Sequence, residues 1–270
     1  MTRFGLPILK PAEVVTIEQI VRLTLHADEQ YELQLGDAVG FEFGLGIMGS
    51  DLPGIDWANQ VRDIAPLAEW DGPRIVEAVE QAYGARQLRC LEVGFAGGMG
   101  DPGVVRAFEQ RRYQRVSGDI WRMGTPRFDA VRNDLSVIPA RASFAKVAEL
   151  WRAYPTQDSL REQYADLGQR YLDETMVDGL LALDGTEPAG TLNLVTFGEL
   201  GLVADLFVHP RHQGKKVGQT LLWHAVELAA RCQVKHLTLL CRRDNIAAAR
   251  LYEKTGFVKI APMEHLRWVG

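Results

Sequence analysis

Two groups of residues in the second half of the chain have types and spacing that could do chemistry. The first is Gln213-Gly-Lys-Lys-Val-Gly218, which follows a strand-like stretch ending at Pro210 and opens a helix-like stretch at Val217. Free backbone N–H groups at a helix start, the positive end of the helix dipole and concave loop N–H groups all bind anions. Lys215 and Lys216 add positive charge, so the segment predicts a diphosphate site rather than an exposed basic turn.

The second group is Asn245-Ile-Ala-Ala-Ala-Arg-Leu-Tyr-Glu-Lys-Thr-Gly-Phe257. Together the two segments resemble the GNAT superfamily of acyl-CoA-dependent N-acyltransferases. The phosphate loop of that family reads Q/R-x-x-G-x-G/A, and its later signature reads N-x-x-A-x-x-L/F-Y-x-x-x-G-F. The later signature matches at every fixed position, and the resemblance is specific over about residues 200–260. One residue departs from it: Lys216 replaces the first glycine of the loop, and we expect it to keep a negative φ.

The resemblance implies a function for each matched residue. Tyr252 would protonate the departing CoA thiolate as a general acid, although spacing alone also fits an aromatic residue packed in the core. The residues that would bind the cofactor are Leu206, Phe207 and Val208 along the pantetheine arm, Gln213, Gly214, Lys215, Lys216, Val217, Gly218 and Gln219 at the pyrophosphate, and Asn245, Ala248 and Tyr252 near the pantetheine.

The acceptor amine must be neutral to attack, so the reaction needs a base or a water chain. Asp205 is the best-placed acid, three residues before Val208 on the same predicted strand, and it could alternatively fix the strand or contact the substrate. The weaker candidates are Glu199, His209 and His224. His209 and His212 have no further ligands nearby, so we expect no metal.

The function that follows is transfer of an acetyl group from acetyl-CoA to a primary amine, by direct attack in a ternary complex. The acceptor would be a small molecule or a peptide. Two alternatives stay open: a non-catalytic protein that binds or senses acyl-CoA, and an acyltransferase that uses another acyl-CoA. Retention of Tyr252 argues against the sensor, because the corresponding residue in the first half is Phe108.

The first half repeats the second at an offset of 144 residues. The segment Arg106–Val116 is similar to Arg250–Ile260, which indicates a tandem duplication. In the first half Glu69 and Asp71 would repel a diphosphate, and Pro73 lacks an N–H donor. We therefore expect a degenerate GNAT-like half that binds no cofactor.

A second glycine-rich loop, Gly98-Met-Gly-Asp-Pro-Gly103, fits the dinucleotide-binding pattern, with Asp119 at about the expected distance. Asp101 would place a carboxylate in the phosphate cradle, and Pro102 removes a donor. No mononucleotide-type βαβ unit follows it. We therefore reject a dinucleotide site here.

The elements that must position these residues define an α+β protein. We predict two tandem GNAT-like domains, each a mixed, mostly antiparallel sheet flanked by helices: residues 1–125 without a cofactor site, a linker at 126–134, and an acetyl-CoA-binding domain at 135–270. The predicted strands include 55–64, 88–93, 113–123, 135–139, 200–208 and 236–241, with a last strand or two from 257. The predicted helices include 217–232 and 246–254.

Composition limits the partners. The chain has 270 residues, 47% of them hydrophobic, and a net charge of −5, so nucleic acid is disfavoured. Three widely spaced cysteines indicate neither a disulfide framework nor a zinc site. No apolar run is long enough to span a membrane, and the start has no signal core, so we predict a cytoplasmic protein that is a monomer or homodimer.

Overall fold

The computed structural model describes residues 15–65, 67–129, 131–154 and 157–270. Its helices are α1 (Ile17–Glu32), α2 (Gly72–Gly84), α3 (Pro102–Glu109), α4 (Phe144–Arg152), α5 (Arg161–Asp173), α6 (Val217–Arg231) and α7 (Ile246–Thr255). Its strands are β1 (Asp37–Phe41), β2 (Gly44–Met48), β3 (Asn59–Ile64), β4 (Glu92–Phe95), β5 (Tyr113–Met123), β6 (Leu135–Pro139), β7 (Val177–Asp184), β8 (Glu187–Phe197), β9 (Leu200–Val208), β10 (His236–Arg242) and β11 (Phe257–Trp268).

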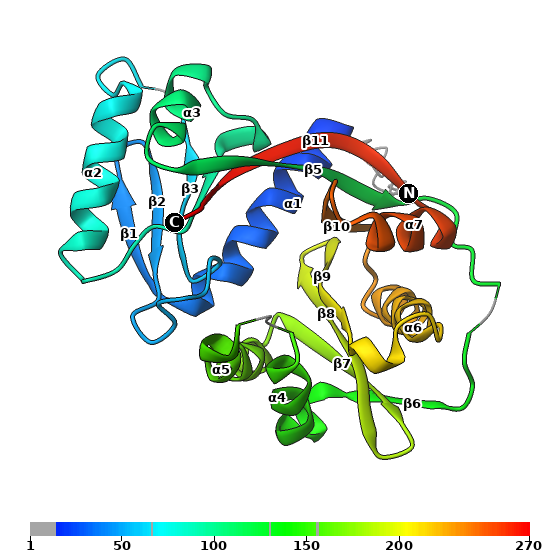
Figure 1. The fold of residues 1–270 in the computed structure, drawn as a ribbon. Coiled ribbons are helices and arrows are strands. Elements are labelled where there is room, and N and C mark those ends of the chain that lie inside the picture. Colours follow the sequence, from blue (N-terminus) through cyan, green and yellow to red (C-terminus); the bar gives the residue numbers. More distant parts are fainter. Residues whose placement is uncertain (1–14, 66, 130, 155–156) are drawn as a thin grey trace, which may run out of the picture.

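All these strands belong to one sheet, in the order β1-β2-β3-β4-β11-β5-β10-β9-β8-β7-β6 (Figure 1). Within the described residues, β3 pairs with β4 and β9 with β10 in parallel, and the other neighbours are antiparallel. The predicted mixed, mostly antiparallel sheet flanked by helices is therefore confirmed, with the strands of both halves joined in one sheet.

The last strand of each half lies inside the other half. β5 pairs with β10 on one side and with β11 on the other, and β11 also pairs with β4. Trp121 on β5 is packed in the core formed by α6 and α7, whereas Leu266 on β11 is packed with residues of α2 and α3. The two domains and the linker at 126–134 stay predictions, and the described strands of both halves share one sheet. Residues 1–14 and 66 of the predicted first domain, and residue 130 of the linker, lie outside the described residues.

Most predicted strands form where expected, and β5, β6 and β9 have the predicted bounds. The stretch 55–64 is a strand only from Asn59, because Asn59 Nδ2 donates to the carbonyl oxygens of Leu52 at 2.7 Å and Ile55 at 3.2 Å and holds the preceding residues in turns. The strand predicted at 88–93 instead spans Glu92–Phe95. From Phe257 onward there is one strand, with a bulge between Lys259 and Ala261.

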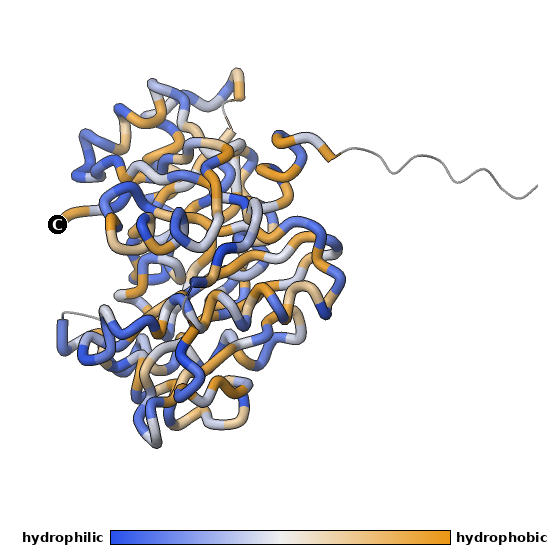
Figure 2. Tube along the Cα trace, turned by 90° about the vertical axis from the view of Figure 1, so that its right-hand side faces the viewer, coloured by the Kyte–Doolittle hydropathy of each residue, from blue (hydrophilic) through white to orange (hydrophobic). Residues whose placement is uncertain are grey.

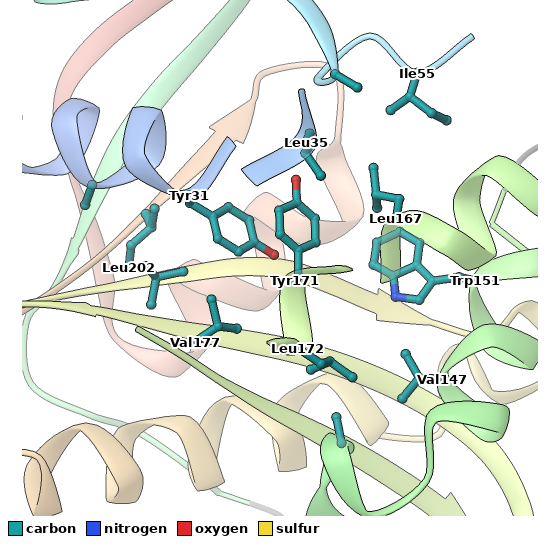
Figure 3. Close-up of a cluster of buried hydrophobic side chains, with 14 of the residues drawn as sticks. Tyr31, Leu35, Ile55, Val147, Trp151, Leu167, Tyr171, Leu172, Val177 and Leu202 are labelled. Atoms are coloured by element: carbon teal, nitrogen blue, oxygen red, sulfur yellow. The ribbon is translucent and has the colours of Figure 1, made fainter. Parts of the chain in front are cut away.

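Two buried clusters lie on opposite faces of the sheet. Leu202 belongs to the cluster beneath α1, α4 and α5, and the next residue, Val203, belongs to the cluster beneath α6 and α7. Successive side chains of a strand point to opposite faces, so these helices cover the two sides. The first cluster combines residues of both halves, among them Tyr31 of α1 and Tyr171 of α5 (Figure 3).

Hydrophobic and hydrophilic residues alternate over short distances along the coloured part of the chain trace (Figure 2). In α2, for example, Ile75, Val76, Val79 and Tyr83 are buried, and Glu77 and Glu80 are exposed. This is the pattern of helices that pack one face on a sheet. Among the described helices, none is long and apolar enough to cross a membrane.

Candidate functional site

The site forms where β9 and β10 part. Their parallel pairing ends at Val203 and Leu239, yet β9 continues to Val208 and β10 to Arg242. On its other side β9 has a bulge: Ala204 pairs with Asn193 and Phe207 with Thr191 of β8, so two residues of β9 stand opposite one of β8. A bulge bends a strand and redirects its side chains. Asp205 lies in this bulge with φ +51°, in the left-handed region.

A cavity of about 600 Å³ lies between the parted ends of β9 and β10. Its lining brings together three of the sequence-predicted site residues, Asp205, Leu206 and Tyr252. It also brings in residues that the sequence did not single out. From the first half these include Asp28, Asp56, Trp57 and Glu92, and from the second half Tyr154, Tyr171, Arg242 and Arg267. The cavity therefore belongs to both halves of the chain.

The Asp205 carboxylate is partly buried and held by two side chains. The Tyr31 hydroxyl donates to Asp205 Oδ2 at 2.5 Å, and Asn193 Nδ2 donates to the same oxygen at 3.5 Å. The pKa of Asp205 is raised to about 6, mainly by burial. The hydrogen bond from Tyr31 lowers this pKa, the charge of Asp28 raises it, and the hydrogen bond from Asn193 lowers it. A carboxyl group with this pKa can take up a proton near neutral pH.

Tyr252 lies on α7 and is 7% exposed, so most of its ring is core. It packs against Trp121 and Phe257, with ring centroids 6.2 and 5.8 Å away. Burial, with a smaller effect of Cys241, raises the pKa of Tyr252. The phenol therefore keeps its proton at neutral pH and can donate it to a group in the cavity.

The start of α6 is open to an anion. Lys216 caps the helix without a side-chain hydrogen bond, and the N–H groups of Val217, Gly218 and Gln219 donate to no other described residue. Lys215 and Lys216 are exposed. Val217, Gly218 and Gln219 are buried, so they would contact a diphosphate through their backbone. Gln213 Nε2 donates to the Val208 carbonyl oxygen at 3.3 Å, which joins the loop to β9.

The expected negative φ of Lys216 is wrong. Lys216 has φ +63°, and Gly214, two residues earlier, has φ +74°. The chain turns from the loop into α6 through a left-handed residue, which is why a glycine fits that position. The lysine side chain makes this conformation unfavourable by roughly 1–2 kcal/mol.

Asn245 and Ala248 meet at the start of α7. Asn245 Oδ1 accepts a hydrogen bond from the Ala248 N–H at 3.2 Å, so the observed contact is a helix N-cap. Asn245 is exposed. Its predicted contact with a pantetheine stays a prediction.

The weaker base candidates do not line the cavity. Glu199 forms an ion pair with Lys235 at 2.6 Å. His209 Nδ1 accepts from the Arg211 N–H at 3.2 Å, and burial lowers the pKa values of His209 and His224. In the described part of the chain, no three His, Cys, Asp or Glu side chains gather as a metal site would require.

The corresponding helix starts in the first half are capped by their own carboxylates. Asp71 accepts from the Arg74 N–H at 3.0 Å at the start of α2. Asp101 accepts from the Gly103 and Val104 N–H groups at 2.8 and 3.1 Å at the start of α3. These N–H groups are unavailable to a phosphate. Phe108, at the position of Tyr252, is 1% exposed.

The site thus combines a bulged strand, a parallel neighbour that parts from it and a helix start without a side-chain cap. Residues 144–257 match the family model described as "Acetyltransferase (GNAT) family", and this part of the chain belongs to that family. The resemblance to the GNAT superfamily stated from the sequence is thereby confirmed, and the degenerate tandem first half stays a prediction.

One curated relative is similar over a short stretch. The chain is 33% identical over 69 residues to the L-methionine sulfoximine/L-methionine sulfone acetyltransferase of Salmonella typhimurium. That stretch covers 24% of this chain and 40% of the relative, so less than half of the relative's length is matched.

Solved structures share the fold over most of the chain. A GCN5-related N-acetyltransferase from Kribbella flavida has a TM-score of 0.61 and 15% identity, covering 93% of this chain and 96% of its own. A functionally unknown conserved protein from Staphylococcus epidermidis has a TM-score of 0.62 and 12% identity, covering 86% and 93%. At these identities the likeness concerns the fold.

Proposed function

We propose that the chain transfers an acetyl group from acetyl-CoA to a primary amine of a small molecule or peptide, by direct attack in a ternary complex. The observation that carries the proposal is the cavity between β9 and β10, which joins a carboxyl group with a pKa of about 6 to a protonated phenol. Such a pair can accept one proton and donate another in a single reaction.

The residues at the start of α6 fit the diphosphate of acetyl-CoA. Three backbone N–H groups without a described partner, the helix dipole and two exposed lysines converge there. Residues Leu206, Phe207 and Val208 lie on the part of β9 that β10 leaves unpaired. In the proposal their backbone pairs with the pantetheine arm, which then runs from α6 toward the cavity.

In the cavity, the acceptor nitrogen attacks the thioester carbonyl carbon. The carbon–nitrogen bond forms and the carbon–sulfur bond breaks. Asp205 takes the proton that the nitrogen must lose, and Tyr252 gives its phenolic proton to the departing sulfur. Asp205 then carries one proton more and Tyr252 one fewer, and both return to their starting states by proton exchange with water.

A steady-state assay with the Tyr252→Phe variant tests this function. With acetyl-CoA and a panel of amines, we expect the wild type to release CoA thiol only when an acceptor is present. Tyr252→Phe should lower kcat by about 10²-fold or more, because general acid catalysis is lost, and should leave the Kd for CoA unchanged.

Three results would contradict the proposal or redirect it. Binding of acetyl-CoA without transfer to any amine would favour the sensor. Transfer from a longer or acidic acyl-CoA in preference to acetyl-CoA would identify another donor. A Tyr252→Phe variant with full kcat would remove Tyr252 from the mechanism. The cytoplasmic location, the oligomeric state and the absence of nucleic-acid and membrane partners stay predictions from the sequence.

A further inference from the structure

Helix α1 belongs to the first half of the chain but lies against strands of the second half. It contacts β8, β9, β10 and β11. The hydroxyl of Thr24, in the middle of α1, forms a hydrogen bond of 3.2 Å with Thr238 of β10. Both threonines are fully buried. The helix is therefore fixed across the parting of β9 and β10.

The last turn of α1 carries Tyr31, which is 2% exposed. Its ring stacks on Tyr171 of α5, with centroids 3.9 Å apart and planes 11° apart (Figure 3). Buried rings stacked in this way have few alternative rotamers. The position of the Tyr31 hydroxyl is therefore determined by the core that the two halves share.

The hydrogen bonds around the Tyr31 hydroxyl determine the direction in which it donates its proton. Asn193 Nδ2 donates to the Tyr31 oxygen at 2.7 Å, so the single proton of the phenol is left to go to Asp205 Oδ2, 2.5 Å away. Among the described residues, the hydrogen bonds to the carboxylate of Asp205 go to Oδ2. The other oxygen, Oδ1, is left for an acceptor amine.

We propose that Tyr31 of the first half is the positioning residue that holds Asp205 as the base of the second half's site. This inference rests on the function proposed above. It gives the first half, whose helices α2 and α3 are capped by Asp71 and Asp101, a direct part in the reaction. A chain that kept only the second-half elements would lose the 2.5 Å bond from Tyr31 and keep the longer, 3.5 Å bond from Asn193 Nδ2 to the Asp205 carboxylate.

The charged and titratable groups around Asp205 come from several elements. Asp28 lies on α1, Tyr164 and Tyr171 on α5, and Tyr154 just after α4. Asp28 is itself paired with Arg62 at 2.6 Å, so its charge is partly compensated. The phenols are protonated at neutral pH because burial raises their pKa values. Tyr31 is the group whose proton bonds to the carboxylate.

The Tyr31→Phe variant removes this bond and keeps the stacked ring. The carboxyl pKa of Asp205 is measured by ¹³C NMR titration of the free protein, and the pH profile of kcat/KM is recorded alongside. We expect the pKa of Asp205 to rise by about one to two units, because a hydrogen bond to the ionised form is lost. The acid limb of the kcat/KM profile should shift to higher pH by the same amount. At pH values above this limb, activity should recover.

Tyr113→Phe is the matched control. It removes another buried hydroxyl of the first half, which donates to the Cys90 carbonyl oxygen at 2.6 Å and lies in the core beneath α2 and α3. Its loss should leave both the Asp205 pKa and the acid limb unchanged.

Two results would overturn the proposal: an Asp205 pKa in Tyr31→Phe equal to that of the wild type, or an activity loss of equal size at every pH. If the chain transfers acetyl groups to no amine, the proposed function fails, and the NMR titration still decides whether Tyr31 controls Asp205.

Discussion

At the scale of single residues, the site contains some side chains that the sequence pattern predicted and others that it could not predict. Asp205 and Tyr252 could be selected because they stand in a family pattern on a strand and a helix. Tyr31 and Asn193 could not, because their only signal is a contact made across 174 and 12 residues of chain. A single sequence contains no record of such pairings.

The Asp205→Asn variant tests the carboxyl group through stability. The pKa of Asp205 is about 6 in the folded protein and 3.8 in a free side chain. The folded state therefore binds the proton more tightly, and this contribution to stability is lost as pH rises from about 4 through 6. Replacing Asp205 by asparagine should raise the free energy of unfolding, relative to the wild type, by about 1 to 3 kcal/mol more at pH 7.5 than at pH 4.

Urea unfolding at the two pH values measures this difference. Asp119→Asn is a control for which the pH dependence should be opposite. Burial raises the pKa of Asp119, but the hydrogen bonds from Arg243 and Lys259 have the larger combined effect and lower this pKa. That variant should lose more stability at pH 7.5 than at pH 4. A pH-independent effect of Asp205→Asn would show that its pKa is ordinary.

At the scale of elements, sequence periodicity located most strands, because alternation and turn residues are local signals. It could not show which strands pair. The exchange of β5 and β11 between the halves, the bulge at Asp205 and the parting of β9 from β10 all depend on contacts between distant segments. The left-handed Lys216 was missed for a related reason, since a lysine gives no signal for a positive φ.

Strand exchange predicts that the two halves unfold together. Leu266 of β11 is fully buried in the core of the first half, although it belongs to the end of the chain. Leu266→Ala should lower the free energy of unfolding by about 2 to 5 kcal/mol, in a single urea transition. Hydrogen exchange should accelerate in β3 and β8 alike.

Val258→Ala is the control on the same strand, because Val258 is 52% exposed. It should change stability by no more than about 0.5 kcal/mol. Two separate transitions, or faster exchange in β3 alone, would show that the halves are independent folding units.

At the scale of the whole molecule, the two halves share an order of elements, from α1 in the first half and from α5 in the second, and differ in the residues at their helix starts. Adding 144 to the first residues of α3 and β5 gives the first residues of α7 and β11. The first half caps its helix starts with Asp71 and Asp101 and has Phe108 in place of a phenol. The sequence could predict this asymmetry, because charge and hydrogen-bonding capacity are properties of residue types. It could not predict that the halves would build one cavity between them.

The proposed function requires that one acetyl-CoA binds per chain, at the start of α6. Calorimetry of CoA and acetyl-CoA with the wild type and three variants tests it most directly. Lys216→Glu places a carboxylate at the proposed diphosphate, Lys216→Gly keeps the left-handed turn without the charge, and Glu69→Lys alters the corresponding loop of the first half. We expect one site in the wild type, at least about tenfold weaker binding in Lys216→Glu, a retained site in Lys216→Gly, and no change in Glu69→Lys. Absence of binding at millimolar ligand would contradict this proposal. So would a site that Glu69→Lys weakens and that Lys216→Glu leaves unchanged.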